Sequence, residues 1–333
     1  MQEMALVQFN LNTYIINITK TMQTNIWKES IQGYEWPDQL RNIMVKDEIV
    51  PRFNKEDLLR LAFNSSEESY FVLTFLSIEY FELGLLWVQQ AIQAGVKRFA
   101  VAAVDIVTAE KLHKLKIPHF IIELHHIILE KSSENNPGGF NGKAMALINS
   151  RTQIIKFLLE SGVNVLSCDI DAIIIKNPMP VLENSNEIAF QRVVYFPKPL
   201  ARIWGFTACC GFVAFRTSAE VVSLLNRVIN IQKIVSSDQL ALNLALMEYN
   251  VEWALNRNLF ESDEMLTTEF KSIASKSIYG RLPKTEISLE ALPATTFWRH
   301  KFVSLDRNSI IVLHPNSPKS LQGKLDIFNE YLQ

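Results

Sequence analysis

Two aspartates one residue apart mark the segment NVLSCDIDAIIIKNP, which runs from Asn164 to Pro178. Asp169 and Asp171 stand between two apolar stretches, and burying a carboxylate is costly unless it is paired or holds a metal. Alternate residues of a strand face the same way, so both carboxylates are expected on one side, with Ile170 turned into the core. Such a pair is typical of a Mg²⁺ or Mn²⁺ site that substrate phosphates complete. A pair of solvated turn acids is the alternative.

The elements that must position these acids are short apolar runs that predict buried strands. They are Ser69–Leu76, Lys97–Asp105, Pro118–Leu124 and Val163–Asp169. Helical patterns separate them, so the chain predicts an α/β fold of β-α-β units, with a mixed, mostly parallel sheet flanked by helices. Ligands bind such sheets at the carboxyl ends of the strands, where Asp105 and Asp169 both fall. The two acids are therefore expected to share one crevice.

The rest of the chain divides into an N-terminal segment and the remainder of one domain. Residues 1–66 have a mostly polar, helical pattern and are expected to form a helical accessory segment that packs on the main domain, residues 67–333. Within that segment, VPRFNKEDLLRLAF predicts the start of a helix. Downstream, EIAFQRVVYF, CCGFVAFRT and SIIVLHP predict strands, and SSDQLALNLALMEYN predicts a helix capped by Ser236 or Ser237.

Composition narrows the class of protein. Apolar residues make up 48 % of the chain, which argues against disorder, and the net charge of −2 argues against a nucleic-acid or anionic-membrane partner. No apolar run reaches the roughly 18 residues needed to span a bilayer, and the stretch MQEMALVQFNLNTYIINITK lacks the features of a signal peptide. The cysteines Cys168, Cys209 and Cys210 give no disulfide framework. A cytoplasmic location is expected.

Several segments, in order over roughly residues 69 to 320, resemble one family. They are the strand-helix-strand from Tyr70 to Asp105, the DxD segment followed by Asn177-Pro178, the GF…FRTS segment from Gly211 to Ser218, SDQLALN, and LHPNSPK from Leu313 to Lys319. Together they resemble the nucleotide-diphospho-sugar glycosyltransferases of the GT-A (Rossmann-like) fold. They are similar in particular to the plant and protist group of α-xylosyl-, arabinosyl- and galactosyltransferases.

The resemblance implies a metal and diphosphate site. Asp171 is expected to bind Mn²⁺ or Mg²⁺ directly, and Asp169 to bind the metal and reach the ribose. His314 is expected to be the third protein ligand, and Lys319 to neutralise the diphosphate. Arg151 stands where the family often has a basic residue and is expected to meet phosphate, with a surface or ion-paired arginine as the alternative.

The resemblance also implies nucleoside and sugar contacts. Asp105 is expected to contact the nucleoside, with Thr74 nearby. Asp238 and Gln239 are expected to face the donor sugar or the acceptor, with Asp238 as a supporting catalytic carboxylate. For both acids the alternative is that they only cap the helices that follow them. Trp204 is considered as an acceptor platform, with core packing as its alternative.

The implied reaction is transfer of a sugar from a nucleotide-diphosphate sugar, expected to be a UDP-sugar, to an acceptor hydroxyl, and the resemblance favours retention. Two departures put the sugar in doubt. Cys209-Cys210 replaces an Asn-containing segment, and Leu86-Trp87 replaces Asn-Trp. A non-catalytic nucleotide-sugar or carbohydrate-binding protein on a GT-A scaffold is one alternative. A Mg²⁺-dependent DxD phosphatase is another, although its motif usually follows the first core strand and Ile173 occupies its Thr/Val position.

Overall fold

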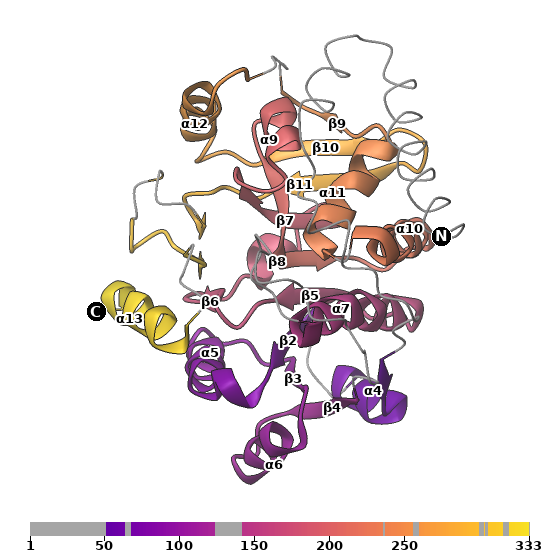
Figure 1. Cartoon of the computed structure of the whole chain (residues 1–333), viewed down its shortest axis with the longest axis vertical. Helices are drawn as coiled ribbons and strands as arrows, with labels where there is room; N and C mark the ends of the chain where they lie inside the picture. Colours follow the sequence, from indigo (N-terminus) through magenta and orange to yellow (C-terminus); the bar gives the residue numbers. More distant parts are fainter. Residues whose placement is uncertain are drawn as a thin grey trace, which may run out of the picture.

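The computed structural model describes residues 51–63, 68–123, 142–235, 237–255, 260–299, 303, 306–315 and 320–332. Within these residues a large sheet has the strand order β1-β4-β3-β2-β5-β8-β7-β11-β10-β9, and a smaller sheet has the order β12-β13-β6. The strands of the large sheet lie one above the other, with helices on either side of the stack (Figure 1). The helices are α4 (Lys55–Phe63), α5 (Phe81–Gln93), α6 (Ile106–Lys114), α7 (Gly142–Glu160), α8 (Met179–Leu182), α9 (Lys198–Trp204), α10 (Ala219–Val235), α11 (Asp238–Glu248), α12 (Asp263–Ser272) and α13 (Leu321–Leu332).

One half of the large sheet is built from the predicted β-α-β units. The strands β2 (Phe71–Leu76), β3 (Phe99–Ala103), β4 (His119–Glu123) and β5 (Val165–Cys168) are parallel to their neighbours in this half. The chain moves outward from β2 to β3 and β4 and then returns to place β5 on the other side of β2. This reversal is a topological switch point, where α/β sheets hold their ligands. The DxD segment directly follows β5, so the strand order itself carries it to that crevice.

The other half of the sheet is mixed. Its strands are β8 (Thr207–Phe215), β7 (Ile188–Val193), β11 (Ile287–Ala291), β10 (Ile278–Leu282) and β9 (Glu252–Trp253). β8 is antiparallel to both β5 and β7, β11 is parallel to β7, and β10 is antiparallel to β9 and β11. Every residue of β7 and β8 is buried, which explains their nearly continuous apolar sequences. The predicted α/β fold with a mixed sheet is thereby confirmed.

The small sheet joins two parts of the chain that are far apart in sequence. β6 (Ile173–Ile174) follows the DxD segment, and β13 (Val312–Leu313) pairs with it antiparallel, so that Leu313 lies opposite Ile173. β12 (Phe297–Trp298) pairs with the other side of β13. The residue after β13 is His314, so this pairing delivers the histidine to the DxD segment.

The described part of the predicted accessory segment packs on the main sheet. β1 (Arg52–Phe53) pairs antiparallel with the edge strand β4, and α4 buries Leu58 and Ala62 completely. Asn54 accepts hydrogen bonds from the first backbone N–H groups of α4, at 3.1 Å and 3.2 Å, which explains where the helix begins. The predicted helix is therefore confirmed. Residues 1–50 and 64–67, which carry the rest of that prediction, lie outside the described residues.

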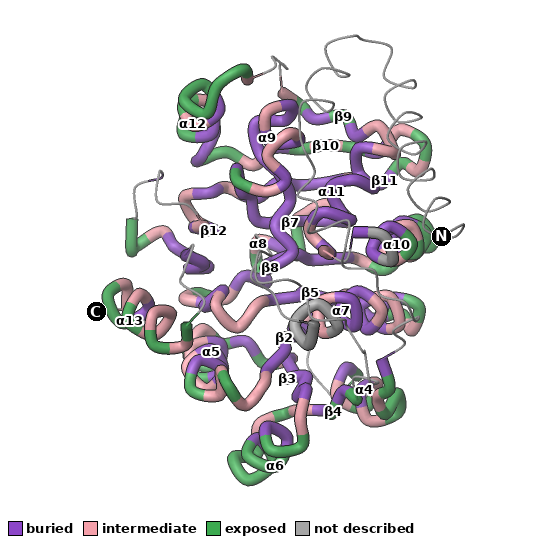
Figure 2. The backbone as a smooth tube through the Cα atoms, in the orientation of Figure 1, coloured by how far each residue is buried: buried purple, intermediate pink, exposed green. Residues whose placement is uncertain are grey.

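The interior and the outer helices differ sharply in exposure. Buried residues follow the strands, while exposed residues gather on the outer sides of α6, α12 and α13 (Figure 2). Trp204 is 3 % exposed and its ring centroid lies 6.0 Å from that of Trp253, so it packs in the core and is no acceptor platform. Among the described helices, none is both long and apolar enough to cross a membrane.

Candidate active site

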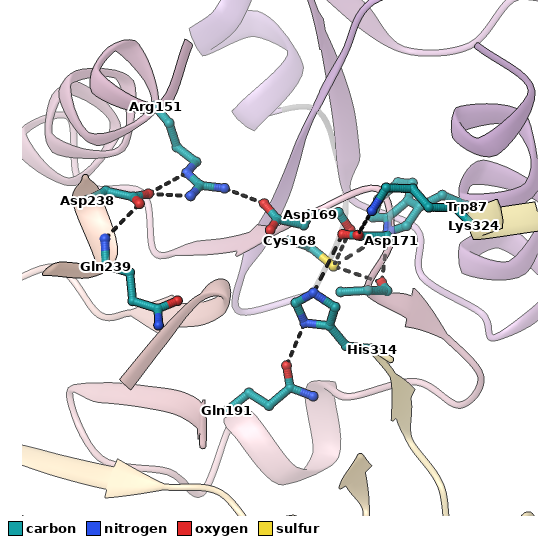
Figure 3. Close-up of polar contacts among 11 residues, drawn as sticks. Trp87, Arg151, Cys168, Asp169, Asp171, Gln191, Asp238, Gln239, His314 and Lys324 are labelled. Carbon is teal, nitrogen blue, oxygen red and sulfur yellow. Dashed lines mark hydrogen bonds and ion pairs between the residues drawn. The ribbon is translucent and has the colours of Figure 1, made fainter. Parts of the chain in front are cut away.

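Asp169, Asp171 and His314 converge at the carboxyl end of β5. Each offers a ligand atom, and these atoms all lie within 4.8 Å of one another. His314 is almost completely buried, and its Nε2 lies 3.5 Å from Oδ1 of Asp171 (Figure 3). Two carboxylates and one imidazole form a donor set that suits Mn²⁺ or Mg²⁺ with further oxygen ligands. The donor set predicted for the metal is therefore brought together by the fold.

The two aspartates converge through a turn, which differs from the strand geometry that the sequence suggested. β5 ends at Cys168, and the backbone N–H of Ala172 donates to the carbonyl of Asp169 at 2.9 Å. The indole Nε1 of Trp87, on α5, donates to the carbonyl of Ala172 at 3.1 Å and fixes the far side of the turn. Ile170 is only partly buried at the edge of the core. The chain turns here because β5, before the motif, pairs with β8 in the large sheet, whereas β6, after the motif, pairs with β13 in the small sheet.

Arg151 links the DxD segment to a third acid. Its Nε lies 3.0 Å from Oδ2 of Asp238, Nη2 contacts the same oxygen, and Nη1 contacts Asp169. Burial alone lowers the pKa of Arg151, but the Asp238 and Asp169 carboxylates outweigh it and raise the pKa above its usual value. The side chain is thus a permanent cation between two carboxylates. Arg151 is therefore ion-paired, as the alternative to a phosphate contact expected. A contact between Arg151 and phosphate stays a prediction.

Asp238 and Gln239 open α11 but do not cap it. Ser237 is the N-cap, and its hydroxyl accepts from the backbone N–H of Leu240 at 3.2 Å, so the capping alternative for Asp238 is wrong. Oδ2 of Asp238 pairs with Arg151, while its Oδ1 accepts from the backbone N–H of Gln239 at 2.7 Å (Figure 3). Gln239 donates from Nε2 to the carbonyl of Phe196 at 2.6 Å, which ties the start of α11 to the segment before α9.

Lys324 on α13 is a site residue that the sequence analysis missed. Its Nζ contacts Oδ2 of Asp171, and both side chains are mostly buried. Burial raises the pKa of Asp171, but hydrogen bonding to His314 and the Lys324 ammonium hold it well below its usual value. No local pattern separates Lys324 from other lysines near the closing helix. Lys319, the lysine that the resemblance singled out, lies outside the described residues.

Gly211 on β8 is a second residue whose role appears only in the structure. A Cβ at this position would lie under 3.0 Å from Cε1 of His314 and 2.6 Å from Oδ2 of Asp169. The carbonyl of Gly211 accepts from the backbone N–H of Asp169 at 2.8 Å. Glycine therefore lets β8 pass directly beneath the two ligands. In the sequence, Gly211 stands out only as part of the GF…FRTS segment.

The cysteine pair before Gly211 is buried on either side of the same strand. Burial raises the pKa of the Cys209 thiol, but Arg299 and His314 outweigh burial and lower it. Burial, followed by the nearby Asp238 carboxylate, raises the pKa of Cys210 well above its usual value. Cys209 therefore belongs to the His314 side of the site, and Cys210 to the Arg151 side.

A third residue that the sequence analysis missed is Gln191 on β7. Its Oε1 lies 2.8 Å from Nδ1 of His314, on the side of the imidazole that faces away from the aspartates (Figure 3). The available signal was the pair Gln191-Arg192, two polar residues inside an otherwise apolar strand.

The predicted nucleoside residues lie on the parallel half of the sheet. Asp105 is the N-cap of α6: one carboxylate oxygen accepts from the N–H of Thr108 at 2.8 Å, and the other accepts from the N–H of Ile78 at 3.0 Å. Asp105 therefore caps α6. Thr74 is buried within β2, and its hydroxyl has no hydrogen-bond partner among the described residues. Contact of either residue with a nucleoside stays a prediction.

Similar proteins are known at the level of family and of solved structure. Residues 94–328 match the family model described as nucleotide-diphospho-sugar transferase. None of the curated proteins matches the chain. Similar solved structures include the bifunctional glycosyltransferase WbbM (12 % identity, 54 % of this chain, TM-score 0.39) and the Streptococcus pneumoniae glycosyltransferase GlyE (14 % identity, 53 %, TM-score 0.34). Mouse xyloside xylosyltransferase 1 is also similar (9 % identity, 74 %, TM-score 0.39).

The extent of the match differs between these proteins. This chain covers 38 % of WbbM and 43 % of GlyE, less than half of each, but 97 % of the mouse xylosyltransferase. The family match covers more than half of this chain and includes Arg151, both aspartates of the DxD segment, Asp238 and His314. The chain therefore belongs to the nucleotide-diphospho-sugar transferase family, whose glycosyltransferases have the GT-A fold.

Proposed function

We propose that this chain transfers a sugar from a UDP-sugar to an acceptor hydroxyl, with retention, in a reaction that depends on Mn²⁺ or Mg²⁺. The observation that carries the proposal is the convergence of Asp169, Asp171 and His314 at the switch point of the sheet. Family membership supports a nucleotide-sugar donor. The phosphatase alternative is dropped because the family match and the place of the motif after β5 both argue against it.

The residues fit the metal by their chemistry. Two carboxylates supply hard oxygen ligands, and the buried imidazole supplies a nitrogen on the same side. A divalent ion held there would offset the charge that builds on the leaving diphosphate as its bond to the sugar breaks. Lys324 already pairs with Asp171, so a metal would compete with its ammonium for the same carboxylate. We expect Lys324, once released from Asp171, to support the diphosphate.

The pairing of the carboxylates supports retention. A direct displacement with inversion needs a carboxylate base that takes the acceptor proton. Asp169 and Asp238 both pair with the Arg151 cation, and Asp171 pairs with Lys324. Each of these three carboxylates is thus already engaged by a cation and not turned toward an acceptor hydroxyl. We therefore expect Asp238 to orient the sugar while the leaving phosphate takes the acceptor proton.

The organisation of the whole chain is part of the proposal. We propose that residues 1–66 are an accessory segment and that residues 67–333 form the transferase domain. This division is supported by the family match, which falls entirely within the second range. We further propose a cytoplasmic location, which the free thiols of Cys168, Cys209 and Cys210 support because a reducing compartment preserves them.

The test compares the release of UDP by the unaltered protein with that by a variant of one metal-binding aspartate. Asp171→Asn keeps the side chain's size but removes a metal-binding charge, and we expect release of UDP from a panel of UDP-sugars with Mn²⁺ to fall about 100-fold or more. Chelation of the metal should do the same to the unaltered protein. The matched control is Asp326→Asn, an exposed acid on the same helix as Lys324, which should leave turnover unchanged. Turnover that survives Asp171→Asn would overturn the metal-dependent mechanism. Binding of UDP-sugars without any turnover would support the binding-protein alternative.

A further inference from the structure

The side-chain amide of Gln191 can take only one orientation. Gln191 is fully buried in β7, and its Nε2 donates to the carbonyls of Phe297 and Trp298, at 3.1 Å each. An amide nitrogen only donates and a carbonyl oxygen only accepts, so the flipped amide would set Oε1 against two other acceptors. The surrounding backbone of β12 therefore decides which end of the amide faces the other way.

This orientation determines where the proton of His314 lies. Oε1 of Gln191 faces Nδ1 of His314 at 2.8 Å. Because Oε1 only accepts, Nδ1 must carry the hydrogen. The protonated imidazole donates from Nε2 to Asp171. The neutral imidazole, which a metal ligand must be, has one N–H, on Nδ1, and Nε2 is left with its lone pair. Nε2 is the nitrogen on the side of Asp171, 3.5 Å from its carboxylate.

We propose that Gln191 is a positioning residue that holds His314 in the Nδ1–H form and so prepares Nε2 as the metal ligand. The inference deepens the proposed function and rests on it, since it assigns a purpose to the third ligand. Trp298 strengthens the arrangement, because its carbonyl accepts from the backbone N–H of His314 at 2.8 Å as well as from Gln191. The backbone and the side chain of the histidine are thus anchored to one point of β12.

Cys209 provides an internal comparison. It lies opposite Gln191 on the neighbouring strand β8, and its thiol also interacts with the imidazole of His314. A thiol is a weak hydrogen-bonding group, whereas the amide oxygen is a strong acceptor. We therefore expect Cys209 to affect the packing of His314 but not its tautomer.

The test reads the tautomer directly, in the metal-free protein and without any sugar. The measurement is nitrogen-15 NMR of the histidine rings at a pH where His314 is neutral, with its signals assigned by comparison with His314→Asn. The His314 ring should show a hydrogen on Nδ1 and none on Nε2. Gln191→Met removes the acceptor while keeping the length of the side chain, and should populate the Nε2–H form. It should also weaken Mn²⁺ binding about 10- to 100-fold, as loss of a partner of a metal ligand does.

Two further variants separate positioning from packing. Cys209→Ala should leave the Nδ1–H form in place, and Gln191→Leu, which also removes the acceptor next to Nδ1, decides the matter if Gln191→Met fails to fold. An Nε2–H signal in the unaltered protein, or an unchanged Nδ1–H signal in folded Gln191→Met, would overturn the inference. If the tautomer is as expected but no UDP-sugar is turned over, the inference stands and the proposed transfer reaction falls.

Discussion

Two buried arginines lie in two regions of this molecule and differ in the groups that they bind. Arg151 lies beside the DxD segment and binds the carboxylates of Asp238 and Asp169. Arg192, on β7, is fully buried, and its hydrogen-bond partners within the described part of the chain are backbone carbonyls, those of Leu292, Ile273, Ala274 and Lys276, at 2.8 Å to 3.2 Å. Its guanidinium also lies between the rings of Phe206 and Phe270, 5.9 Å and 5.7 Å from their centroids.

The difference shows what each charge is for. Arg192 has no carboxylate among these partners, and burial lowers its pKa to about 9. The pKa of Arg151 is instead raised, because the carboxylates of Asp238 and Asp169 outweigh burial. Ile273, Ala274 and Lys276 follow the last residue of α12, where helix carbonyls lack partners within the helix. Arg192 therefore closes a helix end against the sheet. Arg151 instead offsets the charges of Asp169 and Asp238, so that both carboxylates can lie close together at the edge where a substrate would bind.

The strongest way to break this comparison is Arg151→Met. Removing the cation leaves the carboxylates of Asp238 and Asp169 close together with no arginine to offset their charges, and a broken buried ion pair costs about 3 to 5 kcal/mol. The partial exposure of Asp169 favours the lower end of that range. We expect both the free energy of unfolding, measured by urea denaturation, and donor turnover to fall. The double variant Arg151→Met/Asp238→Leu should recover stability but not turnover, and recovery of both would show that the pair has no functional role.

Arg192→Met should separate stability from function. The substitution keeps most of the apolar contact with Phe206 and Phe270. The carbonyls of Ile273 and Ala274 keep backbone donors, but those of Leu292 and Lys276 lose the guanidinium, and each unpaired buried group costs about 1 to 3 kcal/mol. Some of these carbonyls will relax toward water, so we expect a loss of about 3 kcal/mol in all. Turnover per folded molecule should stay unchanged. A fall in turnover as large as that of Arg151→Met would mean that the two regions are not independent.

The glycines of the two regions sharpen the same contrast. Gly211→Ala would drive a Cβ into His314 and Asp169, while Gly280→Ala, on β10, would drive one just as closely into the indole ring of Trp253, which packs on Phe206 beside Arg192. Overpacking of this kind costs about 1 to 3 kcal/mol at either position. Only Gly211→Ala should also weaken Mn²⁺ binding, measured by titration calorimetry. Equal Mn²⁺ affinity in the two variants would argue against the close approach of β8 to the ligands.

The parts of this architecture that could be predicted from the sequence are the locally encoded ones. Fully buried strands have continuous apolar sequences, so β2, β3, β4 and β5 and their crossover helices were predicted with their order. The link between His314 and the DxD segment came only from resemblance to a family. The pairing of β6 with β13 that makes it is a contact between distant segments with no local signature.

The missed residues share a physical cause. Lys324 and Gln191 matter because of where their partners lie in space, and a sequence pattern reports only what lies nearby in the chain. Gln191 still left a trace, because an amide in a fully buried strand needs partners for all its polar atoms. The DxD turn was misread as a strand for a related reason, since the pairing of the chain with β8 before it and with β13 after it sets its path.

The smallest expected effect concerns an acid on the surface. Asp263, at the start of α12, is held by hydrogen bonds from Lys198 and Arg202, which lower its pKa below the usual value. A lowered folded-state pKa means that this stabilisation is present above the unfolded-state pKa of about 3.9 and is lost as the pH falls through the folded-state value. The Asp263 side chain is 61 % exposed, so salt should screen most of the effect.

Asp263→Asn should therefore lower stability slightly at neutral pH and low salt, and should match the unaltered protein at high salt or once the pH has fallen below the folded-state pKa of Asp263. The pKa of Asp171 is lowered too, but its partners Lys324 and His314 are buried with it, so acid should destabilise the metal-free protein through Asp171 even at high salt. Urea denaturation across pH 3 to 7 at two salt concentrations distinguishes the two acids. If salt abolished the acid sensitivity of both, the charges at the DxD edge would be as exposed as those on α12, and the distinction between the two regions would fail.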